Sequence, residues 1–127
     1  GGGQIAIMGS IAAWCGLPTA SAYGASKAGL RNLAEALKVE LEPIGIDLRL
    51  ISPGFVDTPL TARNPFPMPF LMPAPKAAQR IIAGLAGRQF EIAFPAPFAL
   101  LMRLVAHLPR PLFFALTRRL LPKTASG

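Results

Sequence analysis

Tyr23 and Lys27 are the residues whose types and spacing most clearly suggest chemistry. They stand four positions apart in the segment 23–27, so on a helix they share one face and lie close enough to interact. A free tyrosine has a pKa of about 10, and a nearby cation stabilises the phenolate and lowers that value. The pair is therefore a candidate acid/base for proton transfer near neutral pH.

A structural interpretation of the same pair stays open, because Tyr23 could pack at a helix start while Lys27 is solvated. Ser10 and the turn 52–54 favour the chemical interpretation, since each follows an apolar run that is expected to be a strand. Ligands of open α/β sheets bind outside the carboxyl ends of the strands. These elements are therefore expected to converge on one crevice.

Hydrophobic patterning indicates the elements that must position these residues. Residues 4–8 are a short apolar run, typical of a strand buried on both faces of a parallel sheet, and residues 46–52 predict a second strand. Between them, residues 21–41 carry apolar positions at helical spacing, and Pro43 and Gly45 end that helix. Strand, helix and strand form a βαβ unit, which predicts an α/β fold.

The rest of the chain predicts further elements. Residues 59–75 hold too many prolines for a regular helix and are interpreted as a lid or insertion. A helix is expected over 74–87 and a strand over 90–94. Residues 98–121 predict two short helices that are split at Pro109 and Pro111.

Together these motifs resemble the second half of a short-chain dehydrogenase/reductase. The order and spacing agree for Gly9-Ser10-Ile11-Ala12-Ala13, Pro18, Tyr23-Gly24-Ala25-Ser26-Lys27-Ala28-Gly29 and Ser52-Pro53-Gly54-Phe55-Val56-Asp57-Thr58-Pro59. The resemblance is strong over residues 3–60, weak over 75–95 and slight beyond. It implies a Rossmann-type doubly wound parallel sheet. Residues 1–95 would be its C-terminal half, and residues 96–127 a helical, basic C-terminal extension.

The resemblance also implies roles for three catalytic residues. Tyr23 would donate or accept the proton of the substrate oxygen, Ser10 would orient it through a hydrogen bond, and Lys27 would lower the pKa of Tyr23 and bind the ribose. In the family, the glycine-rich fingerprint, the residue that selects NAD or NADP and the catalytic-site asparagine all precede the segment that this chain matches. We therefore expect residues 1–127 to be inactive on their own.

A loop after the second strand would seat the nicotinamide of NAD or NADP, and the resemblance implies that it consists of Pro53, Gly54, Val56 and Thr58. The alternative is a plain turn in which Asp57 or Thr58 caps a helix. The implied activity is carbonyl reduction or alcohol oxidation by hydride transfer. The apolar lid suggests a hydrophobic substrate. The rival hypothesis is a membrane-surface or oligomerisation module that retains a non-catalytic site.

The distribution of charge limits the classes of partner that the protein is expected to bind. The net charge of +7 lies mostly in residues 92–127, which hold Arg103, Arg110, Arg118, Arg119 and Lys123 and no acid. These charges alternate with Leu, Phe and Pro, so we expect no nucleic-acid binding. Two alternatives stay open: peripheral contact with an anionic membrane, or packing over the substrate pocket or a neighbouring subunit.

Single residues add further expectations. Cys15 is the only cysteine, so no intrachain disulfide forms and a cytoplasmic location is expected, with membrane association through the tail left open. Trp14 and Cys15 either line the substrate pocket or pack in the interior. His107 has no neighbouring ligand residues, so no metal site is expected. The helix 21–41 has more apolar positions than one sheet face needs, which predicts a homo-oligomer.

Overall fold

A parallel three-stranded sheet is the centre of the computed structural model, which describes residues 2–57, 68 and 70–121. Its strands are β1 (Gly3–Met8), β2 (Ile46–Pro53) and β5 (Glu91–Phe94), in the order β1-β2-β5. Met8 pairs with Ile51 and Leu50 pairs with Glu91. All three strands therefore end at the same edge of the sheet, and the predicted α/β fold is confirmed.

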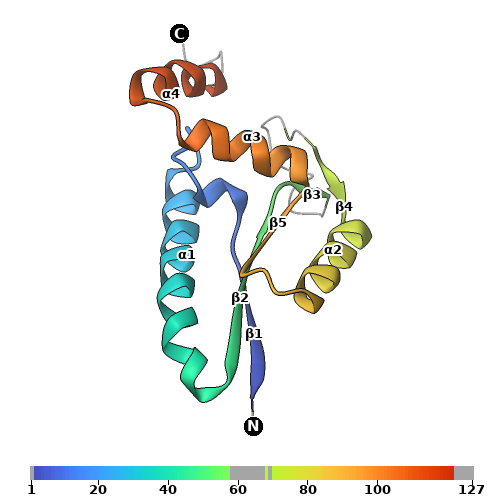
Figure 1. Ribbon diagram of the computed structural model, residues 1–127. Helices are drawn as coiled ribbons and strands as arrows, with labels where there is room; N and C mark the ends of the chain where they lie inside the picture. Colours follow the sequence, from blue (N-terminus) through green and yellow to red (C-terminus); the bar gives the residue numbers. More distant parts are fainter. Residues whose placement is uncertain (1, 58–67, 69, 122–127) are drawn as a thin grey trace.

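Helices cover the sheet on both sides (Figure 1). Helix α1 (Ser21–Leu41) connects β1 to β2 and packs against β2, whereas α2 (Ala74–Ala86) precedes β5 on the other side. A short 3-10 helix, η2 (Glu42–Ile44), follows α1 and ends at Gly45, whose φ of 80° suits a residue without a Cβ. The predicted strand-helix-strand unit and its end signals are confirmed.

Alternation along β2 distributes the core between the two faces. Leu48 and Leu50 pack with Ala34 of α1, while Ile51 packs with Ala77 of α2. Successive side chains of a strand point to opposite faces, so the central strand needs apolar residues on both. Leu48, Leu50 and Ile51 supply these residues, and Arg49 and Ser52 are the buried polar exceptions on the strand.

The prediction that β1 is buried on both faces is wrong for the described residues. Ile5 and Met8 keep 43% and 49% of their surface exposed. The reason is position, because β1 forms the edge of this sheet and pairs with β2 alone.

Arg49 is a buried cation on the α2 face of β2. Its Nε donates to both carboxylate oxygens of Asp47 at 3.0 Å, and its remaining nitrogens donate to the carbonyls of Gly84, Gly87 and Gln89. The Gly84 carbonyl lies in the last turn of α2, where carbonyls lack the usual helical partner, and it accepts from Arg49 as well as from the Gly87 N–H. The same hydrogen bond from Arg49 holds the pKa of Asp47 below its ordinary value.

A second pair of strands and a helical segment complete the described chain. Strand β3 (Val56–Asp57) runs parallel to β4 (Met72–Pro73). The predicted lid lies mostly outside the described residues, and its last part forms β4 and the start of α2. The tail forms α3 (Ala96–Ala106), α4 (Arg110–Thr117) and the 3-10 helix η4 (Arg118–Leu120).

Only one of the two prolines expected to split the tail does so. Pro109 precedes α4, whereas Pro111 lies in its first turn, where the missing N–H would have no helical partner anyway. Among the described helices, none is long and apolar enough to cross a membrane.

A glycine in α2 allows the helix to approach β5 closely. A Cβ on Gly84 would lie 2.6 Å from Cγ2 and 2.8 Å from Cγ1 of buried Ile92. We expect Gly84→Ala to lower the free energy of unfolding by about 1–3 kcal/mol through overpacking. Urea unfolding monitored by circular dichroism measures this.

The matched background is Ile92→Ala, which removes the clashing atoms. There Gly84→Ala should be neutral or stabilising by up to about 1 kcal/mol, because alanine is the better helix former. An equal loss in both backgrounds would contradict the packing explanation.

Candidate active site

Ser10 lies just beyond the end of β1 and is nearly buried. Its Oγ accepts a hydrogen bond from Ala12 N at 3.1 Å and caps the 3-10 helix η1 (Ile11–Ala13). The backbone N–H of Gly9 donates to the Ile51 carbonyl at 2.6 Å, which fixes this end of β1 against β2. The serine hydroxyl therefore has a defined position at the carboxyl edge of the sheet.

Tyr23 and Lys27 extend from the first turns of α1 toward this edge. Lys27 Nζ lies 5.7 Å from the centroid of the Tyr23 ring, so the predicted proximity of the two side chains is confirmed. The same Nζ donates to the Met8 carbonyl at 3.2 Å. Lys27 thus links α1 to the strand end that precedes Ser10, and Tyr23, 52% exposed, remains open to a ligand.

Pro53 and Gly54 end β2 at the same edge. Gly54 N donates to the Phe94 carbonyl at 2.8 Å, and a Cβ at this position would lie 2.7 Å from Phe98 Cδ2. The glycine is therefore required by the phenyl ring that packs against it. Val56 begins β3, and Thr58 lies outside the described residues.

Glu91 is a residue that the sequence analysis missed. Its side chain is only 13% exposed, and its carboxylate accepts three hydrogen bonds. The donors are Trp14 Nε1 at 3.1 Å, Ser52 Oγ at 2.6 Å and Arg31 at 3.1 Å. An acid inside an otherwise apolar predicted strand is the signal that could have indicated it, since a buried carboxylate requires partners.

Glu91 joins the three segments that carry the candidate residues. Trp14 closes η1, whose N-cap is Ser10. Arg31 lies two turns beyond Tyr23 in α1, and Ser52 directly precedes Pro53. One carboxylate therefore connects all three segments, in addition to the Gly9–Ile51 and Lys27–Met8 hydrogen bonds.

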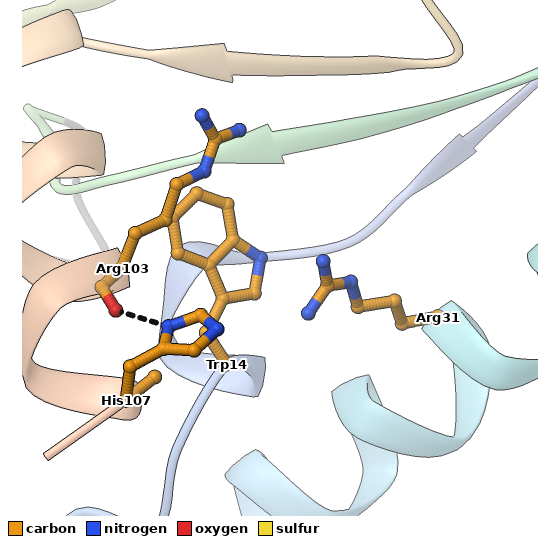
Figure 2. Close-up of a pocket in the computed structure, with 5 residues that line it drawn as sticks. Trp14, Arg31, Arg103 and His107 are labelled. Carbon is orange, nitrogen blue, oxygen red and sulfur yellow. Dashed lines mark hydrogen bonds between the residues drawn. The ribbon is translucent and has the colours of Figure 1, made fainter.

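Cys15 and Trp14 border the same hydrophobic cluster but differ in their other contacts. Cys15 packs partly against the cluster around Ile11 and Phe98, and burial raises the pKa of its thiol. Trp14 also borders this cluster, and its ring faces the Arg31 and Arg103 guanidiniums (Figure 2).

The arrangement brings an exposed phenol, an ammonium and a hydroxyl-bearing strand end to one edge of a parallel sheet. A phenol next to a cation can exchange a proton with a ligand bound there. The edge itself is where open α/β sheets bind ligands.

Comparisons with known proteins indicate the family of the chain. The family model described as short chain dehydrogenase matches residues 1–66. An uncharacterized oxidoreductase of Myxococcus xanthus is 42% identical over 118 residues, covering 93% of this chain and 47% of the relative. A short-chain dehydrogenase/reductase of Hericium erinaceus is 47% identical over 62 residues, covering 49% of this chain and 25% of the relative.

Solved structures show the same fold. A short chain dehydrogenase from Burkholderia cenocepacia, in complex with NADP, superposes with a TM-score of 0.76 at 29% identity and covers 95% of this chain and 48% of that one. A short-chain dehydrogenase from Sphingobium yanoikuyae, in complex with NADPH, has a TM-score of 0.65 at 22% identity. The match covers 84% of this chain and 46% of that one. The chain thus covers at most about half of the length of each of these relatives. With its family match over residues 1–66 and its parallel sheet, the chain belongs to the short-chain dehydrogenase family.

Proposed function

We propose that the protein containing this chain is a nicotinamide-dependent oxidoreductase that reduces a carbonyl or oxidises an alcohol. The observation that carries the proposal is the position of Lys27, which lies beside the Tyr23 ring and donates to Met8 at the end of the strand that precedes Ser10. Membership of the short-chain dehydrogenase family supports the same activity.

Three side chains would carry out the proton chemistry. Tyr23 would donate the proton to the carbonyl oxygen, or accept it from the alcohol, and its exposure leaves it accessible. Ser10 would hold the substrate oxygen through its hydroxyl. Lys27 would favour the phenolate form of Tyr23 by its charge. Two fixed groups at the reacting oxygen stabilise the charge that develops there.

A nicotinamide dinucleotide, NAD or NADP, is the proposed cofactor and would supply or accept the hydride when bound. The residues present fit such a group. An ammonium has three hydrogens, and Lys27 directs one to Met8, which leaves two for ribose hydroxyls. The turn at Pro53 and Gly54, with Val56 and Thr58 after it, would border the nicotinamide. The NADP and NADPH bound to the B. cenocepacia and S. yanoikuyae dehydrogenases support this class of cofactor.

A hydrophobic substrate is supported by aromatic rings next to the proposed nicotinamide loop. Phe98 has its ring centroid 5.7 Å from that of Phe55 and 5.9 Å from that of Phe70. Phe70 is about half exposed, so it offers an apolar surface beside Gly54. Such a surface favours an apolar carbonyl compound or alcohol.

The proton role of Tyr23 is testable in the complete protein. We expect Tyr23→Phe to lower kcat by about 10²–10⁴-fold, because the transferable proton is lost. Unfolding midpoints should stay unchanged, since the side chain is half exposed. Steady-state kinetics with NADH and NADPH on a panel of apolar ketones measures the effect.

Lys27→Ala should lower kcat and weaken cofactor affinity together, because one ammonium serves both tasks. Lys38→Ala is the matched control in the same helix, as Lys38 pairs with Asp47 and Glu42 instead. Turnover near normal in Tyr23→Phe would refute the assignment of the acid/base.

A homo-oligomer is proposed from α1. Small or apolar residues, with one asparagine, recur every three or four positions along its exposed side, at Ala22, Ala25, Gly29, Asn32, Ala36 and Val39. Small side chains let a second helix approach closely. We expect Ala36→Arg to shift the protein toward monomers in analytical ultracentrifugation, whereas Ala86→Arg at the exposed end of α2 should not. A wild type that is strictly monomeric at micromolar concentration would contradict the proposal.

A second candidate function is contact with a membrane surface through residues 96–121. The supporting observation is a set of exposed large apolar side chains among basic residues, namely Leu100, Leu101, Leu104, Leu112, Phe114, Leu116, Leu120 and Leu121. No acid occurs after Glu91, so two copies of this surface would repel each other, while an acidic bilayer attracts it. Burial of the apolar side chains in the bilayer and attraction of the basic residues to acidic lipids would then both favour binding.

Vesicle flotation tests this contact. The complete protein should float with phosphatidylserine-containing vesicles at low salt and release at high salt. We expect Leu112→Ser with Phe114→Ser to reduce binding at least tenfold, and Arg118→Gln with Arg119→Gln to reduce it similarly. Ile82→Ser, an exposed apolar position on α2, is the control and should bind normally. No flotation at low salt would eliminate the membrane contact.

A further inference from the structure

Trp14 lies in a hollow between η1, α1 and α3 (Figure 2). The hollow has a volume of about 300 Å³ and is lined by Trp14, Arg31, Arg103, Ala106 and His107. None of these residues belongs to the proposed catalytic set. A volume of this size suits a small ligand.

Two guanidiniums face the indole of Trp14. Their central carbons lie 5.4 Å (Arg31) and 5.0 Å (Arg103) from the ring centroid. Contact with an aromatic ring holds a cation in place and uses few of its N–H donors. Both arginines line the hollow and therefore keep hydrogen-bonding capacity there.

The charge of the two arginines is only partly compensated. Arg31 pairs with Glu91 at 3.1 Å. The chain has six acidic residues, all of them within the described ranges, and none forms an ion pair with Arg103. One guanidinium at the hollow is thus available to an external anion.

His107 adds an imidazole to the same wall. Its Nδ1 lies 2.6 Å from the carbonyl oxygen of Arg103. A carbonyl only accepts, so Nδ1 carries the hydrogen of this contact, which fixes the ring at the wall of the hollow. The hollow therefore offers guanidinium donors and a fixed imidazole.

We propose that this hollow binds the phosphate group of a small molecule. Arginine donors match phosphate oxygens in geometry and charge. The second pKa of a phosphate monoester is about 6, so near neutral pH it carries almost two negative charges, whereas a carboxylate carries one, and two guanidiniums at the hollow favour the larger charge. Glu91 fixes Trp14 and Arg31 before any ligand arrives, and a preorganised site loses less entropy on binding.

The indole of Trp14 serves as the reporter, because both guanidiniums contact it. The complete protein is titrated with sodium phosphate and with glycerol phosphate at constant ionic strength, and the fluorescence of a Trp14→Phe protein is subtracted. We expect a saturable change with either ligand. Arg103→Gln should weaken binding at least tenfold, and Arg103→Lys should weaken it too, because the planar fork is lost.

Arg110→Gln, an exposed arginine on α4 that is not among the residues lining the hollow, is the control and should bind like the wild type. Thermal unfolding of each variant checks that the fold is kept. A linear, unsaturated response, or equal affinity in Arg103→Gln, would overturn the proposal. Saturation by sodium acetate at the same concentrations would overturn the choice of phosphate. The test needs no turnover, so its outcome is separate from that of the proposed oxidoreductase activity.

Discussion

The buried carboxylate of Glu91 is the interaction on which the geometry of the candidate site depends. It accepts hydrogen bonds from η1, α1 and β2, and these segments carry Ser10, the Tyr23–Lys27 pair and the Pro53–Gly54 turn. A buried charge is tolerated only when it is paired and hydrogen-bonded. Each lost partner would leave a polar group unsatisfied at a cost of about 1–3 kcal/mol. The three segments are therefore constrained as a unit rather than one by one.

The parallel arrangement of the strands also constrains the site, because it places several loops at the carboxyl edge of the sheet. Because β1, β2 and β5 run in the same direction, their ends align, and loops from separate parts of the chain meet. Phe98 of α3 closes the arrangement by packing against Gly54 and near Ile11. Figure 1 shows α3 crossing above this edge. Residues on both sides of position 95 thus share one hydrophobic cluster beside the site.

Local patterns in the sequence predicted the elements well, and long-range contacts badly. The period of apolar residues and the signals at Pro43 and Gly45 located α1 and β2, because these features depend on neighbouring residues. The three hydrogen-bond partners of Glu91 lie 39, 60 and 77 positions away from it in the sequence. No local pattern encodes contacts over such separations. Arg49 was missed for the same reason. The apolar composition of β1 is typical of a covered strand, and among the described residues of a chain that spans about half the length of its relatives only β2 pairs with it.

Helix α3 shows how one short segment can meet several requirements at once. Successive residues of a helix are rotated by about 100° around its axis. Side chains of one helix can therefore contact the core, the solvent and a neighbouring residue on different sides. Phe98 and Met102 face the core, Leu100 and Leu104 face outward, and Arg103 reaches the indole of Trp14. A helix that is apolar nearly all round needs a second partner for its outer side. The proposed lipid contact uses that outer side and the proposed phosphate site uses Arg103, so the two can act in the same molecule without competing for residues.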